Sequence, residues 1–94
     1  MRAVYWAIQN NANIINMSFN LGAYSTELRN AINYATLRGT ICVAAAGNQG
    51  QHMLVYPAAL PNVIGVASTT NDDQRSLFSN YGQDLVWIAA PGEG

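Results

Sequence analysis

The chain has 94 residues, of which 50% are hydrophobic and 10% are charged, and its formal net charge is −1. Scattered arginines without any lysine exclude a nucleic-acid patch or a polybasic membrane segment, and no apolar run approaches the ~20 residues of a transmembrane helix. These few charged side chains cannot cover the surface of a free-standing small domain. We therefore expect much of the surface of this chain to be buried against more protein.

The first part of the chain predicts a helix, a strand and a second helix. Apolar residues at helical spacing between 3 and 12 predict the first helix, and the run "IINMSF" (14–19) is typical of a strand. Ser25 is a suitable N-cap for the second helix, whose apolar face begins at Leu28 and recurs at i+3, i+4 and i+7. Gly39 is a typical residue just beyond a helix C-terminus.

The second part of the chain predicts three more strands. The continuous apolar run "TICVAAA" (40–46) is typical of a strand covered on both faces. Further strands are predicted at 63–67 and 85–90, the last one ended by Pro91 and Gly92. Buried strands joined by helices indicate an α/β fold with a mostly parallel sheet and flanking helices, in a single unit without internal repeats.

The stretch "VAAAGNQG" (43–50) leads from a buried strand directly into Asn48, which stands near two glycines. The carboxyl ends of parallel strands are where open α/β sheets bind ligands. Gly47 and Gly50 permit positive φ and the close approach of another backbone. The Asn48 amide is an uncharged hydrogen-bond donor suited to stabilising an oxyanion. Taken alone, the same residues also fit an ordinary turn.

Several motifs occur together in the order "AIQNNANIINMSF", "VAAAGNQG", "YPAALPNVIGVAS", "SLFSNYG" and "IAAPGEG". In series they resemble the subtilisin-like serine peptidases, or subtilases, over nearly the whole chain. The resemblance implies a partial subtilisin-like three-layer α/β fold, in which residues 1–94 are an internal fragment of a single peptidase domain. It further implies that the parent is a serine endopeptidase, with Asn48 as its oxyanion-hole asparagine.

The resemblance also implies a substrate-binding set. Its members are Ser18, Phe19, Asn20, Ala45, Ala46, Gly47 and Val55. The first three match a segment whose backbone pairs with the substrate strand, and the next three match a wall of the primary specificity pocket. Relatives usually have glycine where Asn20 stands, and asparagine tolerates positive φ better than most residues. Val55 stands where glycine is common at the pocket floor, so we expect a narrower pocket.

Two further expectations concern the loop after this set. The Tyr56–Pro57 peptide bond matches one that is cis in the family. Carbonyls near Ala58, Leu60 and Val63 match a loop that can hold a weak structural cation in relatives. We therefore expect no cofactor and no metal other than such a cation in the parent.

The catalytic triad of a subtilase is an aspartate, a histidine and a serine. In the family the first two precede this region and the serine follows it in a Gly-Thr-Ser segment, which this sequence lacks. The one histidine, His52, is expected to be a solvated loop residue, Asp72 and Asp73 turn formers, and Cys42 a core residue. Residues 1–94 alone are therefore expected to be inactive.

Two other functions stay open at this point. The first is a non-catalytic, subtilase-like module that binds peptides or partners through the same cleft. The second, a nucleotide-binding α/β unit, is disfavoured because phosphate loops open a helix, whereas "QHMLVYP" after "GNQG" has no helical period.

The expected partners are a peptide or protein substrate and the remainder of the peptidase domain, with no nucleic acid and no membrane. Open strand edges and uncovered apolar faces favour self-association of the fragment. The compartment is not determined by the residues, although the resemblance is compatible with a secreted parent.

Overall fold

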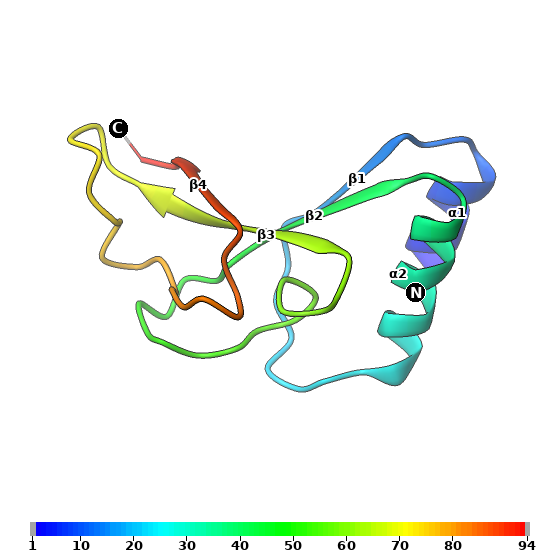
Figure 1. Cartoon of the computed structure of the whole chain (residues 1–94), viewed down its shortest axis with the longest axis horizontal. Helices are drawn as coiled ribbons and strands as arrows, with labels where there is room; N and C mark the ends of the chain where they lie inside the picture. The colour runs from blue at the N-terminus through cyan, green and yellow to red at the C-terminus, as the bar shows by residue number, and fades with distance from the viewer. Residues whose placement is uncertain (1, 94) are drawn as a thin grey trace.

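The computed structural model describes residues 2–93 (Figure 1). In chain order the elements are α1 (Arg2–Gln9), β1 (Ile14–Met17), α2 (Thr26–Leu37), β2 (Ile41–Ala45), β3 (Val63–Thr69) and β4 (Ile88–Pro91). This is the order of helices and strands that the sequence predicts, although α1 is shorter than expected.

The four strands form one sheet in the order β1-β2-β3-β4, and every neighbouring pair is parallel. Ala44 lies opposite Met17 on one side and Gly65 on the other, so β1 and β2 end at a common edge, whereas β3 continues to Thr69. The predicted parallel α/β sheet is confirmed. Helix α2 joins β1 to β2, whereas irregular loops at 46–62 and 70–87 make the other two connections (Figure 1).

Helix α2 begins and ends at the predicted residues. Ser25 is its N-cap, and the Ser25 hydroxyl accepts a hydrogen bond from the Leu28 N–H at 3.2 Å. Gly39 follows the helix with a φ of 81°, which glycine adopts without strain. The buried face of α2 consists of Leu28, Ala31, Ile32 and Ala35. Within residues 2–93, neither helix has the length and apolarity needed to cross a membrane.

The sheet is packed on one face only within residues 2–93. In β2, Cys42 and Ala44 are fully buried, whereas Val43 and Ala45 are partly exposed. The expectation that this strand is covered on both faces is therefore not met, because the helices and the two long loops lie on the same side of the strands (Figure 1). Cys42 is a core residue as predicted, and burial raises the pKa of its thiol.

The last strand starts later than the predicted range 85–90 and covers Ile88–Pro91. Leu85 is buried, but it lies in a turn, in which the Leu85 N–H bonds to the Gly82 carbonyl at 3.1 Å. Its apolar side chain anchors a loop in the core. The sequence pattern cannot distinguish an apolar residue buried in a loop from one buried in a strand. Pro91 is the last strand residue rather than the first residue after it, as an outer strand of a sheet permits.

The packing of α2 can be tested with two leucines of this helix. Leu28 is 0% exposed and Leu37 is 85% exposed. We expect Leu28→Ala to lower the free energy of unfolding of the full-length protein by about 2–5 kcal/mol, because it leaves a cavity. The matched change Leu37→Ala should cost less than about 0.5 kcal/mol. Urea unfolding followed by circular dichroism measures both, and equal losses would contradict this packing.

Candidate functional site

The chain segments that leave the strands at the common edge are tied together by hydrogen bonds. The Asn20 side-chain amide donates to the Ala45 carbonyl at 3.1 Å, which links the chain after β1 to the end of β2. The backbone of Leu21 pairs with that of Tyr56 through two hydrogen bonds of 2.7 and 3.0 Å. The sequence-predicted residues that follow β1 and β2 therefore lie next to the loop that contains Tyr56.

Asn48 lies just beyond β2, at the carboxyl edge of the sheet, and it is exposed. The glycines around it are required by close contacts. Gly47 has a φ of 101°, and a Cβ there would overlap the side-chain amide of Asn80. Gly50 has a φ of 67°, and a Cβ there would overlap the backbone carbonyl of Leu77. A neighbouring segment thus packs directly under the loop that carries Asn48.

The predicted substrate-pairing segment has mixed surroundings. Ser18 and Phe19 are exposed, and the Ser18 hydroxyl accepts a hydrogen bond from Asn16 at 3.2 Å. Asn20 does not adopt a positive φ, so the tolerance of asparagine for that region is not used. Its amide instead bonds to Ala45, which holds the segment at a set distance from β2.

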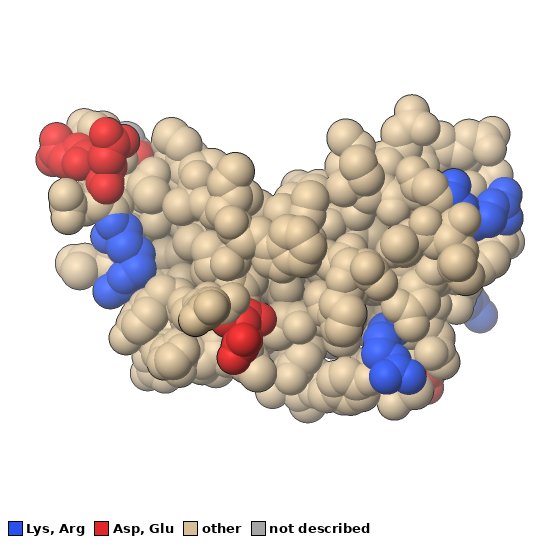
Figure 2. All heavy atoms as spheres, in the orientation of Figure 1, with Lys and Arg blue, Asp and Glu red and all other residues tan. Residues whose placement is uncertain are grey.

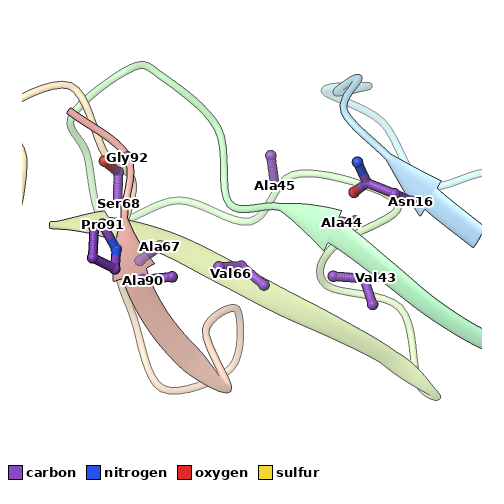
Figure 3. Close-up of a pocket in the computed structure, with 10 residues that line it drawn as sticks. All are labelled: Asn16, Val43, Ala44, Ala45, Val66, Ala67, Ser68, Ala90, Pro91 and Gly92. Carbon is purple, nitrogen blue, oxygen red and sulfur yellow. The ribbon is translucent and has the colours of Figure 1, made fainter. Parts of the chain in front are cut away.

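The open face of the sheet carries a shallow depression of about 290 Å³. It is lined by Asn16, Val43, Ala44, Ala45, Val66, Ala67, Ser68, Ala90, Pro91 and Gly92, which come from or follow the four strands (Figure 3). Figure 2 shows a hollow with uncharged walls along the upper edge of the molecule, over the strands labelled in Figure 1. The lining side chains are mostly small and apolar, so this face suits packing against apolar atoms.

The predicted members of the specificity pocket differ in their surroundings. Ala45 lines the depression, whereas Ala46 and Val55 are each 1% exposed and belong to the apolar core. The role of Val55 at a pocket floor stays a prediction, as do the roles of the other substrate-binding residues.

The remaining polar candidates are loop and turn residues, in line with the sequence interpretation. His52 is exposed and stacks on Tyr81, with ring centroids 5.6 Å apart. Asp72 and Asp73 belong to a turn in which both N–H groups bond to Thr70, and Asp73 has a φ of 61°. Such geometry is typical of aspartate in turns.

The Tyr56–Pro57 bond is cis, as predicted. The chain turns directly after it, because the Leu60 N–H bonds to the Pro57 carbonyl at 2.9 Å. Across residues 2–93, no group of three or more histidine, cysteine, aspartate or glutamate side chains is placed to hold a metal ion. A weak cation held by backbone carbonyls in this loop stays a prediction.

Asn80 lies in the motif "SLFSNYG", but nothing in the sequence around it indicates a role at the site. The Asn80 side chain is 0% exposed and bonds to the loop that carries Asn48. No local pattern marks this burial, because an asparagine between a serine and a tyrosine is typical of an exposed turn.

Comparison with known proteins gives consistent matches. The family model described as the subtilase family (peptidase S8) matches residues 1–94. A thermophilic serine proteinase of Bacillus sp. (strain AK1) is 41% identical over 90 residues, which cover 96% of this chain and 22% of that protein. Thermitase of Thermoactinomyces vulgaris is 42% identical over 89 residues, which cover 95% of this chain and 32% of that protein.

Solved structures show the same likeness. The prenylagaramide maturation protease PagA has a TM-score of 0.89 at 36% identity, over 97% of this chain and 35% of that one. The psychrophilic subtilisin-like protease Apa1 from the Antarctic psychrotroph Pseudoalteromonas sp. AS-11 has a TM-score of 0.83 at 34% identity, over 92% of this chain and 20% of that one.

The parallel sheet and these matches define part of a subtilisin-like serine protease domain. The chain belongs to the subtilase family. It spans about 22–32% of the length of these curated relatives.

The close approach at Gly50 gives a testable consequence. Gly50→Ala should lower the free energy of unfolding of the full-length protein by about 1–3 kcal/mol, because alanine is strained at positive φ and would meet a backbone carbonyl. Gly22→Ala is the matched control, since a Cβ at Gly22 meets no atom within 4 Å. Calorimetric unfolding measures both, and an unaffected Gly50→Ala variant would contradict the loop geometry.

Proposed function

We propose that this chain supplies the oxyanion-hole donor and part of the substrate cleft of a subtilisin-like serine endopeptidase. The observation that carries the proposal is the exposed Asn48 at the carboxyl edge of the parallel sheet, on a loop held between Gly47 and Gly50. Membership of the subtilase family, whose named relatives are serine proteases, supports peptide-bond hydrolysis by the full-length protein.

The chemistry follows from the amide group of Asn48. When a nucleophile adds to the carbon of the scissile bond, the carbonyl oxygen gains negative charge. The Asn48 Nδ2–H group donates a hydrogen bond to this oxygen, and because the amide does not titrate, it is a donor at any working pH. The bond is strongest when the charge has formed, so it favours the transition state over the bound substrate.

The segment Ser18 to Asn20 forms one wall of the proposed cleft. An extended substrate would pair with its backbone as an added strand. The hydrogen bond from Asn20 to Ala45 sets the spacing between this wall and the chain that leads to Asn48. The substrate is therefore held along one segment while its reacting carbonyl meets the next.

The other catalytic groups come from outside residues 1–94 in this proposal. The nucleophilic serine, the histidine base and the aspartate that orients it act with Asn48 only in the full-length protein, so residues 1–94 alone do not hydrolyse peptides. The partly exposed Val43, Ala45 and Val66 support the remainder of the peptidase domain as the partner of this sheet face.

The decisive test is Asn48→Leu in the full-length protein. We expect kcat to fall by about 10²–10³-fold with KM nearly unchanged; this range is the one established for loss of the equivalent asparagine in subtilisin itself. Leucine keeps the approximate shape and deletes the donor. Asn30→Leu, the same change at an exposed position of α2, is the control and should leave both constants unchanged.

Steady-state kinetics on a peptide series measure these effects. A change confined to KM would make Asn48 a substrate-binding or turn residue. A full-length protein without any turnover would favour the non-catalytic binding module instead.

Val55→Gly tests the proposed pocket floor. If Val55 narrows the pocket, glycine should raise the preference for large over small residues before the cleaved bond by about tenfold, because the pocket gains depth. The ratio of kcat/KM values for paired substrates measures this independently of how much enzyme is folded. An unchanged ratio would place Val55 in the core alone, where it is 1% exposed.

A further inference from the structure

A fully buried asparagine lies under the loop that carries Asn48. Asn80 is 0% exposed, and its Oδ1 accepts hydrogen bonds from the N–H groups of Gln49 and Gln51, both at 3.1 Å. Its Nδ2 donates to the Gln49 side-chain oxygen at 2.7 Å, and its backbone N–H donates to the Gly47 carbonyl at 3.2 Å. One residue therefore bonds to the loop on both sides of Asn48.

The neighbouring backbone continues this contact. The Gly50 N–H donates to the Phe78 carbonyl at 2.8 Å, and the Tyr81 N–H donates to the Gln51 carbonyl at 3.2 Å. The segment 78–81 thus runs along the loop 47–51. The N–H groups of Gln49 and Gln51 converge on a single oxygen of Asn80, so that oxygen holds these two loop residues close together.

The segment that carries Asn80 is itself anchored to the sheet. The Ser79 hydroxyl accepts from the Ser68 N–H of β3 at 3.0 Å and donates to the Asn80 carbonyl at 3.0 Å. Arg75 donates to the Ser79 carbonyl at 2.7 Å, and its guanidinium lies 4.5 Å from the centroid of the Tyr81 ring. Asn80 is therefore tied to β3 through Ser79, independently of its bonds to the loop it supports.

We propose that Asn80 is a positioning residue that directs the Asn48 amide toward the oxyanion. This inference rests on the proposed function of Asn48. An oxyanion donor acts only when its N–H lies within hydrogen-bonding distance of the developing charge. Asn48 is exposed, so its direction depends on the loop backbone. The Asn80 side chain holds that backbone at Gln49 and Gln51, after Asn48, and the Asn80 backbone N–H holds it at Gly47, before Asn48. Asn80 itself need not touch the substrate.

A purely structural role for Asn80 makes a different prediction. Loss of the three side-chain hydrogen bonds of Asn80 would lower the amount of folded protein, but each folded molecule would turn over substrate normally. A positioning role lowers kcat per folded molecule, and it does so only while Asn48 has an amide to direct.

A double-mutant cycle in the full-length protein separates the two roles. We expect Asn80→Ala to lower kcat per folded molecule by about 10–100-fold with KM changed less than about threefold, since a donor misplaced by about 1 Å can cost that much. In the Asn48→Leu background, Asn80→Ala should change kcat by less than about twofold, because the donor is already absent. Circular dichroism gives the folded fraction.

Thr40→Val is the matched control. Thr40 is another buried polar residue, 6% exposed, and its hydroxyl donates to the Ala12 carbonyl at 3.0 Å, before the amino end of β2. This variant loses a buried hydrogen bond at the opposite end of β2 from the loop 47–51. It should therefore lower the free energy of unfolding without lowering kcat.

Gln49→Ala keeps the test decisive if Asn80→Ala does not fold. Gln49 is exposed, and this variant removes only the acceptor of the Asn80 Nδ2–H. We expect a fall in kcat of about threefold that disappears in the Asn48→Leu background.

The outcomes distinguish this inference from the proposed function. If Asn48→Leu leaves kcat unchanged, the oxyanion role fails, and the positioning role fails with it. If Asn48→Leu is slow but Asn80→Ala is as fast as the wild type, the oxyanion role stands and the positioning role is wrong. The positioning role is also wrong if Asn80→Ala slows the Asn48→Leu variant as much as it slows the wild type.

Discussion

The parallel register of β1, β2 and β3 is the constraint on which the site depends. Ala44 lies opposite both Met17 and Gly65, so β1 and β2 end at nearly the same level and release their following segments side by side, while β3 continues to Thr69. A shift of β2 by one residue would turn Cys42 and Ala44 from the packed face to the open face, at the cost of core burial. The burial of these two small side chains therefore determines where Asn48 emerges.

Close packing of polar groups shapes the loop after β2. Gly47 and Gly50 leave room for the segment 77–81, and Asn80 accepts hydrogen bonds from two backbone N–H groups of the loop. A buried polar group is stabilising only when its partners are all present, so this arrangement is rigid and sensitive to substitution. Such rigidity is what a preorganised hydrogen-bond donor needs.

The uncovered surfaces are consistent with the proposal that this sheet is part of a larger peptidase domain. The open face of β2 and β3 is apolar. Trp87, just before β4, and Ile88, the first residue of β4, are 68% and 57% exposed. With only 10% of residues charged, few side chains are available to make these surfaces compatible with water. In the proposed function, packing against the remainder of the peptidase domain removes this conflict.

The features that depend on near neighbours could be predicted from the sequence: the cap at Ser25, the buried face of α2, the central strands and the glycines that flank the loop. These signals lie within a few residues, so periodicity and turn chemistry suffice to predict them. The late start of β4 was not predictable in this way, because the apolar Leu85 fills the core from a turn. The burial of Val55 and the support that Asn80 gives to the loop of Asn48 could not be predicted, because both depend on contacts between segments far apart in the chain.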